Sequence, residues 1–257
     1  MKSLDELGFK LEGGGAHISR TIMVRELSML FDFMNSPEAA TKEYRDAIID
    51  QNCLGKRSGN TRKLTFGHLK DLYTLNPAVP IFKAMRFFWD RDKKARPMLA
   101  LLCAIARDPI LRTIASKIIK IRVGDKVPRE TVEQFISVTY PNRFSPATLK
   151  SAAQNINSSL TQAGLLEGRA RKIRHKPELS TGATAYASFL AYLEGNQGVS
   201  LFDNVYTTIL HHPRDMVIEQ AELASAKGWM VFKHIGNVME VDFPKLIDTN
   251  LREKMYG

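Results

Sequence analysis

The sequence has little cysteine and no long apolar run, and both shortages restrict the class of protein. Its 257 residues include only two cysteines, Cys53 and Cys103, with no CxxC pair and no Cys/His spacing typical of zinc sites. The longest purely apolar run, at 98–106, is far shorter than the roughly 20 residues that cross a bilayer. We therefore expect no disulfide framework, metal, cofactor or membrane segment, and we interpret 98–106 as a buried core helix. Nothing resembles a secretory signal, so we expect a cytoplasmic protein.

Motifs that carry catalysis are also missing. Gly55 and Lys56 would belong to a phosphate-binding P-loop only with Gly at position 50 and Ser or Thr at 57, where the chain has Asp50 and Arg57. The nucleophile elbow GxSxG and the zinc-protease motif HExxH do not occur. We therefore expect a binding protein and not an enzyme.

Positive charge is abundant and unevenly placed. The chain carries 37 Lys and Arg against 27 Asp and Glu, a formal net charge of +10. Residues 179–257 hold six of the bases and nine of the acids, so residues 1–178 carry a net charge of +13. A basic excess attracts polyanions, and nucleic acid is the commonest polyanion in a cell. The alternative is a basic surface that only favours solubility.

Hydrophobic periodicity predicts a mainly α fold, a multi-helix protein with winged-helix-like elements and two short β-hairpins. Many of the apolar segments have Pro at or near the start, where a helix tolerates it best. The predicted helices cover about 20–34, 37–53, 61–73, 80–90, 97–107, 109–121, 128–138, 145–163, 183–194 and 213–227. One hairpin is expected near 165–176, and alternating apolar residues predict another at 229–243 with its turn at Gly236 and Asn237.

The order of these elements predicts three domains. Residues 1–95 form an N-terminal helical domain with a basic loop, 96–178 a winged helix-turn-helix-like domain, and 179–257 an acidic helical and hairpin domain. We interpret Ser180, Thr181 and Gly182 as a linker before the third. Within the second domain, Ser145 is the expected N-cap of the longer helix, with Pro146 at its first position and Gly164 as its left-handed C-cap.

Three basic elements are candidate sites for DNA. The loop and helix start near 56–63 combine cations, a hydroxyl and free backbone amides, which suits a phosphate clamp. The polar face of helix 145–163 offers side chains that can reach base edges. The wing at 169–176 has five cations in eight residues, with Arg169 and Arg171 expected on one face and the other three on the opposite face. The candidate DNA-binding residues are Lys56, Arg57, Thr61, Arg62, Lys63, Lys150, Gln154, Arg169, Arg171, Lys172, Arg174 and Lys176.

Each element also has an alternative in which it does not bind DNA. In that case the loop is a solvated segment, the polar face of the helix is an ordinary solvent-exposed surface, and the wing is a run of charged residues that ends a domain. The wing is the strongest of the three, because its charge density is the highest.

Three stretches of the sequence resemble the BrxA family of bacterial phage-exclusion (BREX) systems, over roughly residues 20–178. The residues that carry the resemblance are Tyr44, Ala47, Ile48, Asn52, Leu54 to Ser58, Thr61 to Lys63, Leu69, Leu72, Tyr73, Ala106 to Pro109, Leu111, Arg112, Phe144, Ser145, Thr148, Leu149, Asn155, Ser158, Ser159 and Gly164. The resemblance implies an accessory protein of a defence operon that also encodes a methyltransferase, an ATPase and a phosphatase-like protein. Such a protein would bind double-stranded DNA and neither cut nor modify it.

The function expected from the sequence is therefore non-catalytic, salt-dependent binding of double-stranded DNA, directed largely at its backbone, with other BREX proteins as further partners. Two alternatives remain open. One is a scaffold whose basic surface docks acidic partner proteins, and the other is RNA binding by the helical N-terminal part.

Overall fold

A computed structural model describes residues 3–34, 36–235, 238–248 and 252, and it confirms a mainly helical fold with two short antiparallel hairpins. The helices are α1 (Leu4–Leu7), α2 (Val24–Phe33), α3 (Thr41–Ile49), α4 (Gly59–Tyr73), α5 (Pro80–Arg91), α6 (Arg96–Arg107), α7 (Pro109–Ile118), α8 (Arg129–Thr139), α9 (Pro146–Gln162), α10 (Thr181–Leu193), α11 (Val205–Ile209) and α12 (Arg214–Ala226), with the 3₁₀ helices η1 (Ala16–Ile18), η2 (Lys93–Ala95) and η3 (Gly198–Phe202). The strands are β1 (Leu166–Glu167), paired with β2 (Ile173–Arg174), and β3 (Val231–Ile235), paired with β4 (Val238–Asp242).

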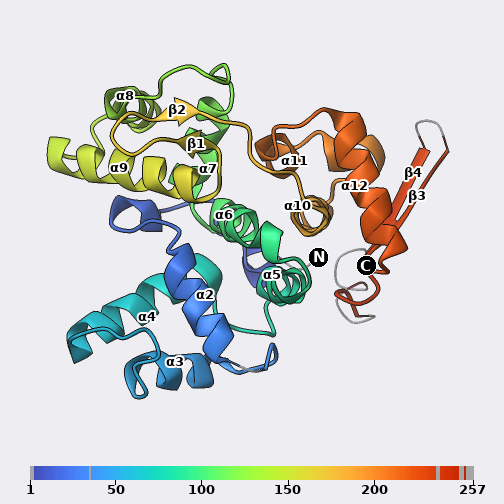
Figure 1. The fold of residues 1–257 in the computed structure, drawn as a ribbon, viewed down its shortest axis with the longest axis horizontal. Helices are drawn as coiled ribbons and strands as arrows, with labels where there is room; N and C mark the ends of the chain where they lie inside the picture. Colours follow the sequence, from blue (N-terminus) through green and yellow to red (C-terminus); the bar gives the residue numbers. More distant parts are fainter. Residues whose placement is uncertain (1–2, 35, 236–237, 249–251, 253–257) are drawn as a thin grey trace.

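Helix α6 lies at the centre of the molecule. Every residue from 98 to 106 is buried, as its uninterrupted apolar sequence predicts. Helices α2, α4, α5, α7, α9 and α10 all pack against it. In Figure 1, α2 to α4 lie on one side of α6, α8, α9 and the first hairpin on another, and α10 to α12 with the second hairpin on a third. No helix in the described part of the chain is long and apolar enough to cross a membrane.

The buried side chains of the three predicted domains belong to one hydrophobic cluster, which runs from Leu7 to Ile247. The predicted linker is wrong. Ser180 is the N-cap of α10, its side chain accepting a hydrogen bond from the Ala183 N–H, and Thr181 and Gly182 form the buried first turn of that helix. Ser at an N-cap followed by small residues thus marks the start of a helix. The same residue types are common in linkers, so composition alone does not separate the two. The division into three domains stays a prediction.

Other boundaries differ in detail. Helix α3 begins at Thr41 and not at Pro37, because the Glu43 side chain accepts a hydrogen bond from the Ala40 N–H at 2.7 Å and so caps the helix there. The predicted turn at Gly236 and Asn237 lies outside the described residues. On β4 the half-buried Met239 and Val241 flank the exposed Glu240, as the predicted alternation requires.

Residues 109–174 have the order of a winged helix-turn-helix. Helices α7, α8 and α9 pack against one another, and β1 and β2 follow α9. The segment 124–127, between α7 and α8, pairs with the free edge of β2: the Val127 N–H donates to the Lys172 carbonyl and the Arg174 N–H donates to the Asp125 carbonyl, at 2.9 and 2.8 Å. This bridge between segment 124–127 and β2 fixes the wing beside the start of α8.

The ends of α9 follow the local sequence. The Ser145 hydroxyl accepts a hydrogen bond from the Thr148 N–H at 3.2 Å, and Pro146 occupies the first helical position. Gly164 has φ +79°, and the Leu165 N–H donates back to the Leu160 carbonyl at 2.8 Å. This left-handed ending turns the chain directly from α9 into the wing.

One buried carboxylate joins three separate parts of the chain. Asp108 Oδ1 caps α7 by accepting the Ile110 and Leu111 N–H groups, both at 3.0 Å. Its Oδ2 accepts the backbone N–H of His17 at 2.9 Å and the Nδ1–H of the same residue at 2.8 Å. The other ring nitrogen of His17 lies 2.9 Å from the Ser159 hydroxyl on α9, and that hydroxyl also accepts the Ile22 N–H.

The Asp108, His17 and Ser159 side chains have the spacing of a hydrolase triad but not its setting. Each is at most 1% exposed, and the Ser159 hydroxyl donates its proton to the Asn155 carbonyl at 2.8 Å. A Cβ added at Gly15 would lie 2.0 Å from Asp108 Oδ1, so the approach of this segment requires glycine. The arrangement therefore serves as a buried structural junction.

We predict that Asp108→Asn destabilises the fold by about 3 kcal/mol, because an amide offers only one oxygen and turns an N–H₂ group toward donors. Urea unfolding followed by circular dichroism measures the change. Asp215→Asn, an exposed change in the first turn of α12, is the control and should cost less than about 0.5 kcal/mol. Equal stabilities of the two variants would contradict the assigned role of Asp108.

The same junction predicts a dependence of stability on pH. Burial opposes ionisation of Asp108, but hydrogen bonds from His17 and from backbone amides outweigh it, so the pKa of this carboxyl lies below its ordinary value. The stabilisation is therefore complete above the unfolded-state pKa of about 3.9 and is lost as the pH falls through the lower folded-state pKa. The stability difference between the native chain and Asp108→Asn should accordingly narrow below about pH 4. A constant difference down to pH 2 would argue against an ionised Asp108.

Candidate nucleic-acid interface

The wing is shorter as a sheet than the sequence suggests. Its strands have two residues each, with Leu166 opposite Arg174 and Glu167 opposite Ile173, and residues 168–172 form the tip. The expected alternation of faces therefore does not apply to the predicted cations at 169–172, because they lie in a loop. Arg169 and Arg171 are both exposed at this tip.

Arg174 does not belong to the exposed surface. Cross-strand partners share a face of a hairpin, and Leu166, the partner of Arg174, is buried against the core. Arg174 is only 1% exposed, and its guanidinium donates to the carbonyl oxygens of Leu165, at 2.8 Å, and His175. Burial lowers the pKa of this guanidinium. The prediction that Arg174 contacts DNA is corrected accordingly: the side chain holds the base of the wing together.

The remaining wing cations differ in how exposed they are and in whether they have a partner within the protein. Lys176 is exposed, while Lys172 is half-buried and its Nζ donates to the Gly168 carbonyl at 2.6 Å, across the tip. Burial lowers the pKa of Lys172. Arg169, Arg171 and Lys176 form no ion pair with any residue that the structure describes. These three side chains are the free charges of the wing.

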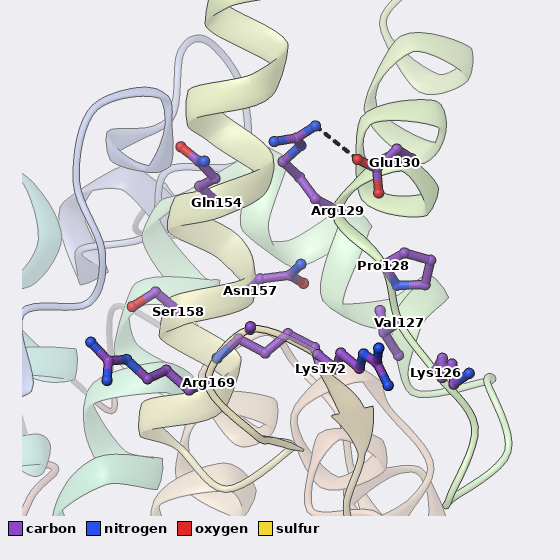
Figure 2. Close-up of a pocket in the computed structure, with 12 residues that line it drawn as sticks. Lys126, Val127, Pro128, Arg129, Glu130, Gln154, Asn157, Ser158, Arg169 and Lys172 are labelled. Atoms are coloured by element: carbon purple, nitrogen blue, oxygen red, sulfur yellow. Dashed lines mark hydrogen bonds and ion pairs between the residues drawn. The ribbon is translucent and has the colours of Figure 1, made fainter.

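Helix α9 presents its polar face beside the wing. Lys150, Ser151 and Gln154 are exposed, whereas Ala152, Ala153 and Ile156 are buried against α6 to α8. The predicted groove-reading face is therefore open to solvent at Lys150 and Gln154. Gln154 lies nearest the wing, since it lines the same cavity as Arg169 and Lys172 (Figure 2).

The predicted phosphate clamp retains only part of its charge. Lys56 Nζ lies 2.9 Å from Glu26 Oε1, with both side chains about a quarter exposed, and Arg62 donates to the Ile49 carbonyl at 2.6 Å. The Ser58 hydroxyl accepts the Thr61 N–H and so occupies the helix N-terminus that a phosphate would use. Arg57 and Lys63 remain exposed. Two of the four predicted cations therefore stabilise the fold, and two point to solvent.

The clamp loop and the wing do not form one surface. Figure 1 shows α4 on the opposite side of α6 from α8, α9 and the wing. The Tyr73 hydroxyl at the C-terminal end of α4 donates to the Ile22 carbonyl near α9, so the loop at the other end of that helix lies away from the wing. The wing and α9 are the part of the predicted site that the fold brings together.

Two residues outside the candidate DNA-binding residues also lie in this region. Lys126 is far from the wing in sequence, but the pairing of segment 124–127 with β2 brings it to the wing. Asn157 has the composition of a polar helix face, yet it is only 5% exposed, and its Oδ1 has no hydrogen-bond partner among the described residues. Lys126, Asn157, the start of α8 and the wing tip surround a cavity of about 580 Å³ (Figure 2).

Among the described residues, no three His, Cys, Asp or Glu side chains are grouped so that they could hold a metal ion. A scan of the sequence against models of known protein families found no match, and a search of curated proteins found none either.

Proposed function

We propose that this chain is a non-catalytic, cytoplasmic double-stranded DNA-binding protein whose interface is the wing tip together with α9. The observation that carries the proposal is the placement of three unpaired cations, Arg169, Arg171 and Lys176, beside the open polar face of a helix in a winged helix-turn-helix order. Unpaired exposed cations attract phosphates at long range, and a helix next to them can enter a groove.

The contacts would be of two kinds. The wing cations grip backbone phosphates, and this term is independent of sequence and dominates the affinity. Lys150 and Gln154 face the groove, where a Gln side chain can bond a base edge. Lys150, Ser151 and Gln154 are the only exposed polar side chains of α9, all of whose residues the structure describes, so sequence preference should be weak.

The resemblance to BrxA proteins supports a place for this activity in phage defence. We propose that the chain brings DNA to other BREX proteins. The C-terminal part, which is acidic on balance, would then face those partners and not the DNA.

We predict that the triple substitution of Arg169, Arg171 and Lys176 to Glu lowers duplex affinity about a hundredfold at low salt. It should also reduce the slope of log K against log salt by about three, since each phosphate contact contributes about 0.9. Fluorescence anisotropy with a labelled 20-base-pair duplex, titrated at several salt concentrations, measures both values. Arg174 is left native, because a buried Glu there would disrupt the wing.

The matched control applies the same charge change elsewhere. Arg214, Lys227 and Lys233 are exposed cations of the C-terminal part, and their triple substitution to Glu changes the net charge equally. We expect less than about a threefold loss of affinity from this control, because it removes long-range attraction but no contact. Equal losses of duplex affinity in the two triple variants would contradict an interface located at the wing. If the wing triple loses assembly with an acidic protein but keeps its duplex affinity, the scaffold function is favoured. If the native chain prefers structured RNA to duplex DNA, the RNA function is favoured.

A second prediction concerns the loop before α4. Because this loop and the wing lie on opposite sides of α6 (Figure 1), Arg57→Glu with Lys63→Glu should leave the salt slope of duplex binding unchanged, whereas a slope lowered by about two, additively with the wing triple, would extend the interface to the loop. The same anisotropy titration tests this. An unchanged slope would limit the interface to the wing and α9.

A further inference from the structure

The cavity beside the wing is larger than contact with a duplex backbone requires. It has a volume of about 580 Å³ and lies between the start of α8, the flank of α9 and the wing tip. Pockets of about 300 to 1,000 Å³ usually hold small organic ligands, and a single phosphate group fills only a small part of such a space. The chemistry of the lining therefore decides what else would fit.

The rim of this cavity is strongly positive. Lys126, Arg169 and Arg171 are exposed there, and none forms an ion pair with any residue that the structure describes. The fourth cation, Lys172, bonds a carbonyl and not a carboxylate. Only the fifth, Arg129, has acidic partners: it lies 2.7 Å from both Glu130 and Glu133. Four cations thus face the cavity without a neutralising carboxylate, which is an environment for an anionic group.

The floor has a different character. Asn157 projects from α9 toward Pro128 in Figure 2 and is 5% exposed, and its Oδ1 has no partner among the described residues. A buried carbonyl oxygen without a partner costs free energy that a bound ligand can recover. Buried Val127 and the exposed Pro128 and Ala170 supply apolar surface around it. An amide combined with apolar walls suits a flat heterocycle that offers hydrogen-bonding groups at its edge.

We propose that this cavity binds a nucleotide, with its phosphate at the cationic rim and its base against the Asn157 amide. The phosphate lies at the rim, among cations that have no carboxylate partner in the described chain, and the base bonds the Asn157 amide, which both donates and accepts. A paired base inside a duplex cannot turn into the cavity. The ligand is therefore a free nucleotide or an unpaired nucleotide at the end of a strand.

This site goes beyond duplex binding and does not depend on it. Arg169 and Arg171 belong to both, so a bound nucleotide would compete with the duplex for the wing tip. The chain would then bind duplex less tightly when the cavity is filled.

The first test is calorimetric titration of the full chain at low salt, without DNA. The probes are the four deoxynucleoside monophosphates, their nucleosides and inorganic phosphate. We expect at least one monophosphate to bind with one-to-one stoichiometry, at least about tenfold more tightly than its nucleoside and than phosphate, because both halves of the site contribute. No binding by any monophosphate, or equal binding of phosphate and of every monophosphate, would overturn the proposal.

A substitution in the floor separates this site from the duplex interface. Asn157→Leu keeps the number and branching of the side-chain heavy atoms and removes an amide oxygen that has no hydrogen-bond partner among the described residues, so thermal stability should change little. Monophosphate affinity should fall about tenfold, whereas duplex affinity stays within about twofold. Ser151→Leu, on the exposed face of the same helix and outside the cavity, should change neither. Unchanged monophosphate binding in Asn157→Leu, with its fold intact, would contradict a base on the floor.

The source of the nucleotide is identified with duplexes. A blunt duplex is compared with the same duplex carrying one unpaired 5′-phosphorylated nucleotide. Tighter binding of the second, reversed by a free monophosphate, assigns the cavity to strand ends, and equal binding assigns it to free nucleotides. Because the calorimetry contains no duplex, a failure of duplex binding would not contradict the nucleotide site. Likewise, a failure of nucleotide binding would not contradict duplex binding.

Discussion

The position of α9 depends on the buried carboxylate of Asp108. Four hydrogen bonds converge on it, two from the start of α7 and two from His17, and the His17 ring continues to Ser159 on α9. A carboxylate removed from water is stable only when its oxygens are well supplied with donors, so the arrangement admits little displacement. The junction fixes α7 and α9 relative to the N-terminal segment, and the wing follows from the end of α9. Asp108, a residue that is only 1% exposed, thereby orients a charged tip that is far from it in sequence.

The positive charge of this protein divides into cations that stabilise the fold and cations that remain available. Arg174 and Arg62 donate to backbone carbonyls, and Lys56 pairs with a carboxylate. Arg86, which is 3% exposed, lies over the Phe31 ring at 4.1 Å. The net charge therefore overstates the number of cations that a bound polyanion can contact. The wing tip combines arginines that have no internal partner in the described chain with the open polar face of α9 beside them.

The sequence predicted the features that depend on near neighbours. Ser145, Pro146 and Gly164 mark the ends of α9 by local geometry, and the apolar run at 98–106 marks the core helix. It could not predict features that depend on pairing across the fold. The inward face of Arg174 follows from its position opposite Leu166, the burial of Asn157 follows from the wing folding beside α9, and the approach of Lys126 follows from a bridge to Ile173. His17 offered no local signal, because its partners are 91 and 142 residues away.

The burial of helix α10 has a consequence for truncated forms of this protein. All of its residues are buried, and it packs on α5, α6 and α12, with the Tyr186 hydroxyl donating to the Ile81 carbonyl at 3.0 Å. Its Gly182 lies so close to α5 and η2 that a Cβ there would fall 2.8 Å from the Asp92 Cβ. A fragment that ends before α10 would leave a long apolar trough open along the central helices, and such surfaces self-associate. Activities of the basic part are therefore best assigned by point substitution in the intact chain, since a truncated one would report on aggregation as much as on DNA.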